Sequence, residues 1–231
     1  MNRNGTAART MEALVLGAII LSSATSVSAD PNYVLDDGSG AYNIGPSQFD
    51  AQLLWGNYFD ATPGAETITE ISVSLSTSVP VGAPISILLF DDPTDDLDPT
   101  DADLLARTDT ITVAPAFNEF QTFDIPDAAV SGGFFVAVMM DLQQGQIAAH
   151  MDDSNDLGRS WLFFDGEINL DDLGSSPLYY NMASTPFNGT WMIRATGVPE
   201  LPASRLCCSV AYSDPPPEPP VVVVALRVRN P

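Results

Sequence analysis

The residues of this chain best suited to chemistry are seven aspartates crowded into Asp91–Asp103, a stretch that reads DDPTDDLDPTDAD. Between residues 30 and 197 the chain has no lysine, and permanent positive charge comes only from Arg107, Arg159 and Arg194. Neighbouring side chains therefore cannot neutralise the acidic stretch. Either water and salt screen its charge, or a divalent cation binds to it.

Calcium is the cation that such a stretch would suit, because it takes about six to eight oxygen ligands, often from closely spaced aspartates. The stretch, like a second acidic group at Asp152–Gly158, lacks the glycine and the glutamate of an EF-hand loop. Acidic loops are also commonly just solvated, and that alternative stays open. The aspartates that we predict as candidate calcium ligands are Asp92, Asp95, Asp96, Asp98, Asp101 and Asp103.

Residues for catalysis form no recognisable set. The only histidine, His150, lies in an apolar segment, and a Ser-His-Asp triad or a zinc site would have to use it. The segment Gly158–Leu162 lacks the second glycine of a nucleophile elbow. Carboxylate pairs for glycoside hydrolysis occur everywhere in so acidic a chain, so they single out no site. We therefore predict no catalytic and no cofactor-binding residues, and expect that the chain is not an enzyme.

Aromatic side chains bear on a sugar-binding role. Exposed aromatic rings can stack on sugars, whereas large aromatic residues in strands usually pack in the core. Trp161 and Trp191 lie inside apolar segments, so we expect both in the core. Tyr179 and Tyr180 stand beside a proline and before a loop, and we expect this pair to be exposed.

The elements that must position these residues are short β-strands. Ile71, Val73 and Leu75 alternate with serines, which is typical of a half-buried strand, and Ile85–Phe90 and Phe134–Met140 are continuous apolar runs typical of central strands. Further strands are predicted at Leu53–Phe59, Thr108–Val113, Glu119–Ile125, Gln146–Met151, Ser160–Phe164 and Thr190–Ala195. Helix is expected only in short pieces, around Ser47–Leu54 and Asn169–Leu173. About nine or ten strands with frequent turns predict an all-β, antiparallel β-sandwich of jelly-roll-like type.

The two ends of the chain differ from its middle. Residues 1–29 have a basic start, a short apolar run and small residues before a cleavage point, so we predict a signal peptide and export. The apolar run is shorter than the about 20 residues of a membrane span, and no stable transmembrane anchor is expected. Residues 198–231 are rich in proline and are predicted to be a disordered tail. Residues 30–197 remain as one β-sandwich domain.

The net charge of the chain excludes some classes of binding partner. The chain has a formal net charge of −22, which would repel nucleic acid and anionic membrane surfaces.

The only cysteines, Cys207 and Cys208, are neighbours in the predicted tail, so no disulfide can stabilise the domain at 30–197. Its stability must come from burial, to which a calcium ion bound in the acidic stretch would add.

Packing and turn motifs recur along the predicted domain. In chain order they are Asp101–Leu105, the Phe-rich Phe120–Ile125, Gly132–Val138, Gly158–Trp161 and Gly189–Ala195. Together they resemble the jelly-roll-like β-sandwich domains of bacterial secreted and cell-surface proteins, over roughly Ile68–Ala195. The resemblance implies an exported, non-catalytic sandwich, and it carries no ligand over to this chain.

The residues that follow, Val198-Pro199-Glu200, are similar to the start of the PEP-CTERM sorting signal of exported bacterial proteins. Leu201 replaces the second proline of that signal, and no membrane-length apolar helix follows. The tail therefore resembles a degenerate version of the signal.

These observations predict an exported, non-catalytic β-sandwich with a structural or binding role at the cell surface or in extracellular matrix. Extracellular polysaccharide or surface components are the expected partners, and nucleic acid is not. A calcium-dependent carbohydrate-binding module is the alternative, and a glycoside or other hydrolase comes third.

Overall fold

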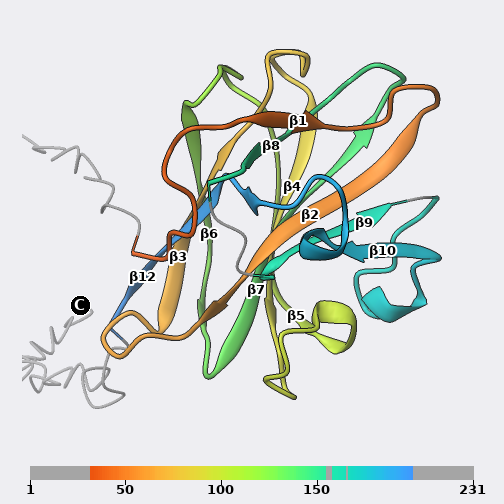
Figure 1. Ribbon diagram of the computed structural model, residues 1–231. Coiled ribbons are helices and arrows are strands. Elements are labelled where there is room, and N and C mark those ends of the chain that lie inside the picture. Colours follow the sequence, from red (N-terminus) through yellow and green to blue (C-terminus); the bar gives the residue numbers. More distant parts are fainter. Residues whose placement is uncertain (1–31, 155–157, 165, 200–231) are drawn as a thin grey trace, which may run out of the picture. The chain divides into compact units, whose positions relative to one another are not determined.

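The structure of the protein, a computed structural model, describes residues 32–154, 158–164 and 166–199 (Figure 1). The predicted signal peptide at 1–29 lies outside the described residues, as does the predicted tail beyond Pro199. Within the described part of the chain, no helix is both long and apolar enough to span a membrane.

Twelve strands make up about half of the described chain, joined by turns and three short 3-10 helices. The strands are β1 (Tyr42–Ile44), β2 (Ala51–Asp60), β3 (Thr67–Ser74), β4 (Pro84–Asp91), β5 (Asp103–Ile111), β6 (Phe120–Ala129), β7 (Gly133–Leu142), β8 (Ala149–Asp152), β9 (Ser160–Phe164), β10 (Leu178–Asn181), β11 (Thr190–Trp191) and β12 (Ile193–Val198). The 3-10 helices are η1 (Pro99–Asp101), η2 (Leu173–Ser175) and η3 (Met182–Ser184).

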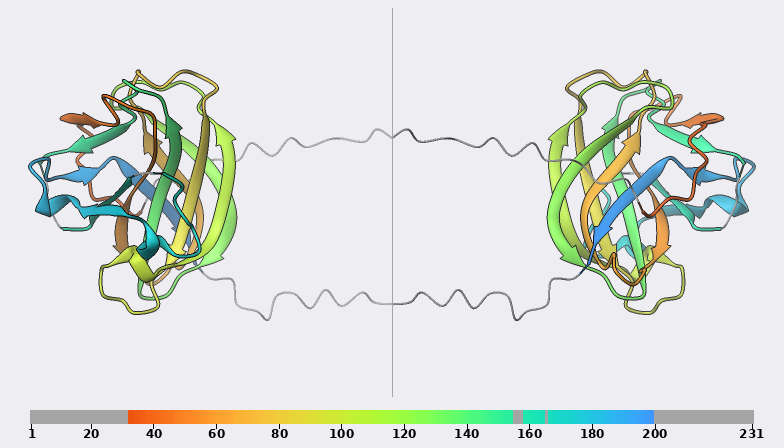
Figure 2. Two further views of the ribbon diagram at one scale, coloured as in Figure 1. Left: turned by 90° about the vertical axis from the view of Figure 1, so that its right-hand side faces the viewer. Right: turned by 90° about the vertical axis from the view of Figure 1, so that its left-hand side faces the viewer.

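The strands pair antiparallel in three sheets, which confirms the predicted fold class. A six-stranded sheet has the order β10-β9-β2-β7-β4-β5, and a three-stranded sheet has the order β12-β3-β6. A second three-stranded sheet, β1-β8-β11, connects to the chain just after β3 through an isolated bridge between Leu75 and Ala149. Figure 2 shows the layers of this sandwich from two sides.

The main core lies between the six-stranded sheet and the smaller sheets. Alternate residues of β2, such as Leu53, Trp55 and Phe59, face Ile71 and Val73 of β3 across this interior. Each large apolar side chain that is fully buried contributes about 2 kcal/mol to stability. The inner face of the six-stranded sheet, defined as the face toward this core, therefore supplies much of the driving force for folding.

The outer face of the same sheet is also partly covered. A second apolar cluster there contains Leu54, Phe135 and Phe163 from the sheet, together with Ile168 and Leu173 from the chain between β9 and β10. Strands β2 and β7 are thus buried on both faces, which explains why β7 reads as a continuous apolar run. The cover does not extend over the whole outer face, and the part left open forms the groove described below.

Several sequence predictions need correction. Ser47–Leu54 is not helical, because Ala51 already begins β2 and its side chains alternate between the two apolar clusters. Only Leu173 of the predicted helix Asn169–Leu173 is helical, in η2. The strand count exceeds nine or ten because short edge strands such as β1 and β10 lack a sequence pattern, and Thr190–Ala195 breaks into β11 and β12.

Candidate functional site

Asp92 is the centre of the acidic loop between β4 and β5. Its side chain is only 2% exposed, and its carboxylate accepts hydrogen bonds from the hydroxyl of Tyr58 (2.5 Å) and from Thr94. The backbone N–H groups of Asp95 and Asp96 also donate to it, at 3.0 and 3.1 Å. Burial alone would raise the pKa of Asp92, but the hydrogen bonds from Tyr58, Thr94 and Asp95 outweigh it and lower the pKa below its usual value. Asp92 is therefore ionised and holds the loop in shape.

Three of the six predicted calcium ligands come together. One carboxylate oxygen from each of Asp92, Asp96 and Asp101 lies within 4.8 Å of the other two. Asp96 and Asp101 are exposed, so a cation could reach them from solvent. Three carboxylates are a suitable but incomplete set for calcium, because the remaining ligands of its about six to eight would have to be carbonyl groups or water.

The other three predicted ligands have different positions. Asp98 accepts the N–H of Thr100 at 3.0 Å and so caps η1. Asp103 opens β5 directly opposite Asp91 of β4. Asp95 has a positive φ of 55°, and its carboxylate lies against the tight turn at Gly132. The structure does not group these residues with the Asp92, Asp96 and Asp101 cluster.

The second acidic group, after β8, serves a local role. Asp152 is 1% exposed and accepts hydrogen bonds from the backbone N–H groups of Asp37 and Ser154, both at 2.7 Å. Burial would raise the pKa of Asp152, but these hydrogen bonds lower it. Residues 155–157 of this group lie outside the described residues, so its calcium-binding capacity stays a prediction.

The candidate catalytic groups are engaged in structural contacts. His150 is 1% exposed, its Nδ1 lies 2.8 Å from the hydroxyl of Ser74, and burial lowers its pKa. Ser160, from the segment that resembles a nucleophile elbow, donates to the side-chain oxygen of Asn57 at 2.8 Å in the interior. Neither group lines the groove described in the next paragraph.

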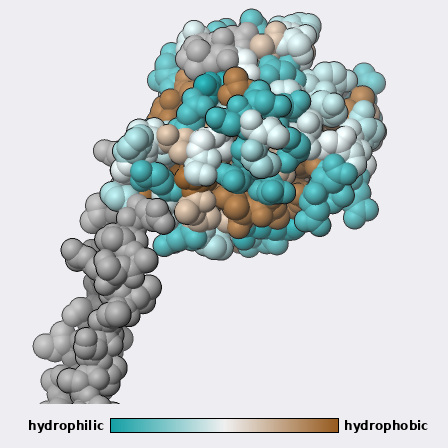
Figure 3. Space-filling model, turned by 90° about the horizontal axis from the view of Figure 1, so that it is seen from below, coloured by the Kyte–Doolittle hydropathy of each residue, from teal (hydrophilic) through white to brown (hydrophobic). Residues whose placement is uncertain are grey.

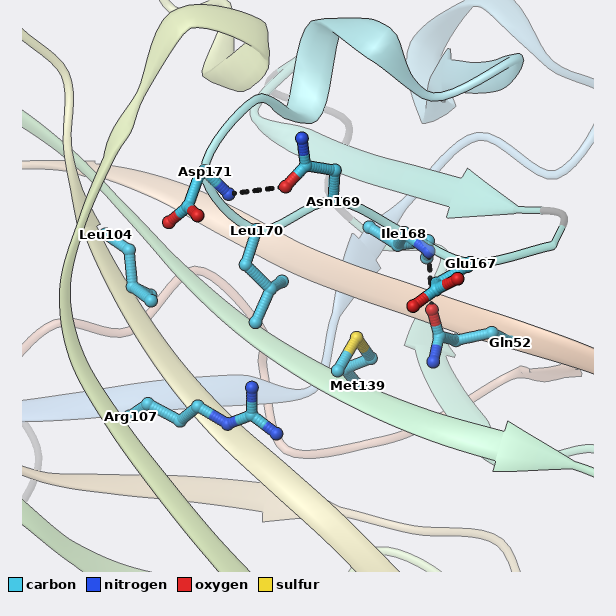
Figure 4. Close-up of a pocket in the computed structure, with 9 residues that line it drawn as sticks. All are labelled: Gln52, Leu104, Arg107, Met139, Glu167, Ile168, Asn169, Leu170 and Asp171. Carbon is cyan, nitrogen blue, oxygen red and sulfur yellow. Dashed lines mark hydrogen bonds between the residues drawn. The ribbon is translucent and has the colours of Figure 1, made fainter.

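An open groove lies on the outer face of the six-stranded sheet, beside the apolar cover. Its larger part has a volume of about 610 Å³, and a neighbouring part of about 300 Å³ shares Gln52, Arg107 and Met139 with it (Figure 4). The other residues that line the larger part are Leu104, Glu167, Ile168, Asn169, Leu170 and Asp171. The groove thus runs between β5 and the segment 166–171, which we call the crossing segment.

Hydrogen bonds fix the walls of this groove. The Nε of Arg107 donates to Asp109 at 2.8 Å, and the hydroxyl of Ser86 donates to the same carboxylate at 2.6 Å. Both hydrogen bonds lower the pKa of Asp109, and the one from Ser86 has the larger effect. On the other side, Gln52 donates to Asp141 and accepts the backbone N–H of Ile168 at 2.6 Å. The groove is therefore preformed by contacts between residues far apart in the chain.

No sequence pattern predicts this groove, because its walls come from β2, β4, β5, β7 and the crossing segment. The only related feature of the sequence is that Arg107 and Asp109 lie two residues apart in β5. It places a cation and an anion on the same face of a strand, and both prove to line the groove.

The aromatic side chains are arranged largely as expected. Trp191 is fully buried, Trp161 is partly buried, and Tyr179 and Tyr180 are each 43% exposed. Tyr179 stacks on Phe163 with 5.8 Å between ring centroids and lies 6.5 Å from the ring of Trp161. Because successive residues of a strand point to opposite faces, Tyr179 and Tyr180 do not form one joint platform.

Comparisons with known proteins reveal no relative: no family model matches the chain, and no curated protein or solved structure is significantly similar to it.

Proposed function

We propose that this protein is an exported, non-catalytic β-sandwich that acts by binding, at the cell surface or in extracellular matrix. The observation that supports the proposal most is the groove on the outer face of the six-stranded sheet. Ligand sites are typically concave and largely preformed, with a few fixed polar groups on an apolar floor. Arg107 and Asn169 supply polar groups here, and Met139 and Leu104 supply the floor. An extracellular polysaccharide, long and rich in hydroxyl groups, fits an open groove of this kind.

The use of the reactive side chains also supports a binding role. His150 contacts Ser74 in the interior, Ser160 contacts Asn57, and the carboxylate of Asp92 is surrounded by donors from its own loop. Each of these groups stabilises the fold and would have to give up a buried hydrogen bond in order to react.

The proposal is tested by retention of the purified full chain on washed cells of the producing organism and on their protease-treated extracellular polysaccharide. Asn169→Trp places a large ring in the groove at an exposed position. Ala129→Trp places the same ring at an exposed position of β6, in the β12-β3-β6 sheet, and serves as the control. We expect the wild type and the control to be retained and the Asn169 variant to be lost. Equal retention of both variants would show that the groove is not the binding surface.

A calcium-dependent carbohydrate-binding module is the second candidate, favoured by the cluster of Asp92, Asp96 and Asp101. The loop that carries this cluster leads directly into Leu104, which lines the groove. Its η1 also contacts η2, since a Cβ at Gly174 would lie 3.0 Å from the carbonyl oxygen of Thr100. A bound cation would thus stiffen one border of the groove.

Calcium binding is tested by thermal unfolding with calcium and with excess EGTA. A ligand that binds the native state alone raises the melting temperature. We expect a calcium-specific rise that is lost in Asp96→Ala/Asp101→Ala and kept in the matched control Asp124→Ala/Asp127→Ala, two exposed acids of β6. The same rise with magnesium or with sodium chloride at matched ionic strength would mean that salt merely screens the loop.

A further inference from the structure

The hydrogen-bonding groups of the groove are not equally available to a ligand. Both ends of the Gln52 amide are engaged, one with Asp141 and the other with the N–H of Ile168. The Nε of Arg107 is engaged with Asp109. The carboxylates of Glu167 and Asp171 are both exposed, and neither has a hydrogen bond or ion pair within the described chain. The groove therefore offers a ligand more acceptors than donors.

Charge in the groove is also unbalanced. Each of the three arginines in residues 32–199 already has a carboxylate partner: Arg107 pairs with Asp109, Arg159 with Asp60, and Arg194 with Asp36. No lysine is present in this range. Within the described residues, no unpaired cationic side chain is therefore left to offset the charge of Glu167 and Asp171.

The two carboxylates stand on a segment that is fixed to the sheet. Ile168, next to Glu167, is 6% exposed and belongs to the outer apolar cluster, against which Leu170 also packs. Figure 4 shows Arg107 on one side of the groove and the crossing segment, with Glu167, Asn169 and Asp171, on the other. The carboxylates are thus held across the groove from Arg107 instead of extending from a loose loop.

We infer that the groove binds a sugar chain that carries free amino groups, and that Glu167 and Asp171 select it. The inference rests on the proposed function and adds the chemical class of the ligand. Protonated amines would donate to the two carboxylates, while hydroxyl groups would bond to Asn169 and to the free end of the Arg107 guanidinium. The apolar face of a sugar ring would lie on Met139 and Leu104. Chains dense in uronic acids would be repelled by the same carboxylates.

The test is calorimetric titration of the full chain with a glucosamine hexasaccharide and with its fully N-acetylated counterpart, which has the same backbone without the charge. We expect the amine form to bind more tightly at a pH at which it is protonated, and the preference to vanish at a pH at which it is neutral. Exposed ion pairs are individually weak, so Glu167→Gln and Asp171→Asn should each reduce affinity for the amine form about two- to fivefold. Affinity for the acetylated form should change little.

A charge-matched control separates selection from general attraction. Asp127→Asn removes one exposed carboxylate from β6, in the β12-β3-β6 sheet, just as each groove variant removes one. If this control weakens binding as much as the groove variants do, the net charge of the protein causes the preference and the inference is wrong. Equal binding of the acetylated hexasaccharide would overturn amine selection while leaving glycan binding intact. Binding of neither sugar also overturns the inference, whereas the proposed function is judged separately by retention on cells and polysaccharide.

Discussion

In the sequence, Asp92 is a candidate calcium ligand, but in the structure its carboxylate holds its own loop together through hydrogen bonds. Its two oxygens receive donors from Tyr58, Thr94, Asp95 and Asp96. A buried carboxylate is stable in a fold only when such donors replace water. The sequence shows that seven acids are close together, but not that one of them turns inward. The Asp92, Asp96 and Asp101 cluster is consequently a site with one fixed and two solvent-facing members.

The buried contact between Tyr58 and Asp92 gives the first prediction at this scale. Tyr58→Phe removes a hydrogen bond to a charged acceptor, and burial together with the nearby carboxylate already raises the pKa of this phenol. We expect the free energy of unfolding to fall by about 2 kcal/mol. Tyr179→Phe is the matched control, since it removes the hydroxyl group of an exposed tyrosine. Urea unfolding measures both, and equal effects would contradict a special role of the Tyr58 contact.

Asp91 gives a prediction that depends on pH. Its Oδ1 is buried without a hydrogen-bond partner in the described chain, and burial, with the charges of Asp92 and Asp103, raises its pKa. The folded state therefore prefers the protonated form, and the stability that Asp91 contributes at low pH is lost as the pH rises through its folded-state pKa. Asp91→Asn should be more stable than the wild type at neutral pH, and the difference should shrink below about pH 4, near the pKa of an unfolded aspartate.

Urea midpoints at neutral and acid pH measure this difference, with the exposed Asp127→Asn as the control. The opposite result would be that Asp91→Asn is less stable than the wild type at neutral pH and that calcium stabilises only the wild type. That result would indicate that Asp91 has a cation as its partner.

At the scale of the elements, the sequence predicted the central strands and several edge strands, but not the short edge strands β1 and β10. Strands β2, β4 and β7 are buried on both faces, so their apolar runs stand out. β10 has four residues and is mostly exposed, so no pattern distinguishes it from a loop. β5 begins at Asp103, five residues before the predicted start at Thr108, because pairing with β4 continues into the end of the acidic stretch. Tertiary pairing, which the sequence does not display, sets such boundaries.

The groove was beyond prediction for a related reason. The crossing segment has no secondary-structure pattern, and its position depends on Ile168 and Leu170 reaching the outer apolar cluster. The sequence shows that these residues are apolar but not which of the two faces of the sheet they cover.

The crossing segment provides the prediction at this scale. Ile168→Ala should free the segment from the sheet, because it removes most of a side chain that is 6% exposed. We expect a loss of about 2 kcal/mol in stability, faster hydrogen exchange at residues 166–171 and weaker binding in the groove. Val81→Ala, at a side chain that is 70% exposed, is the control and should change none of these. Unchanged exchange in the Ile168 variant would show that the segment is held by other contacts.

At the scale of the whole molecule, surface charge is the dominant property. The formal net charge is −22, and the face seen from below is largely hydrophilic, with smaller groups of hydrophobic side chains between the polar ones (Figure 3). Such a charge favours solubility but destabilises the compact state through self-repulsion. Only three arginines lie within the described residues, and each is in one ion pair with a carboxylate.

Added salt should therefore stabilise this protein. We expect the melting temperature to rise by about a few degrees between low and high concentrations of potassium chloride, because screening weakens repulsion among many carboxylates more than it weakens three ion pairs. Differential scanning calorimetry with EGTA present separates this effect from calcium binding. A fall in melting temperature would mean that the ion pairs, above all the pair between Arg194 and buried Asp36, outweigh the repulsion.

The contacts of the first described residues with β12 have a mechanical consequence. Tyr33 bridges Ala195, and the side chain of Asn32 bonds to both backbone groups of Gly197, so the chain enters and leaves the sandwich at neighbouring points. A pulling force applied to both ends would peel these bonds open one after another instead of shearing a whole strand at once. The molecule should therefore yield to tension gradually, from this seam inward, and the ion pair between Asp36 and Arg194 should break after these outermost bonds.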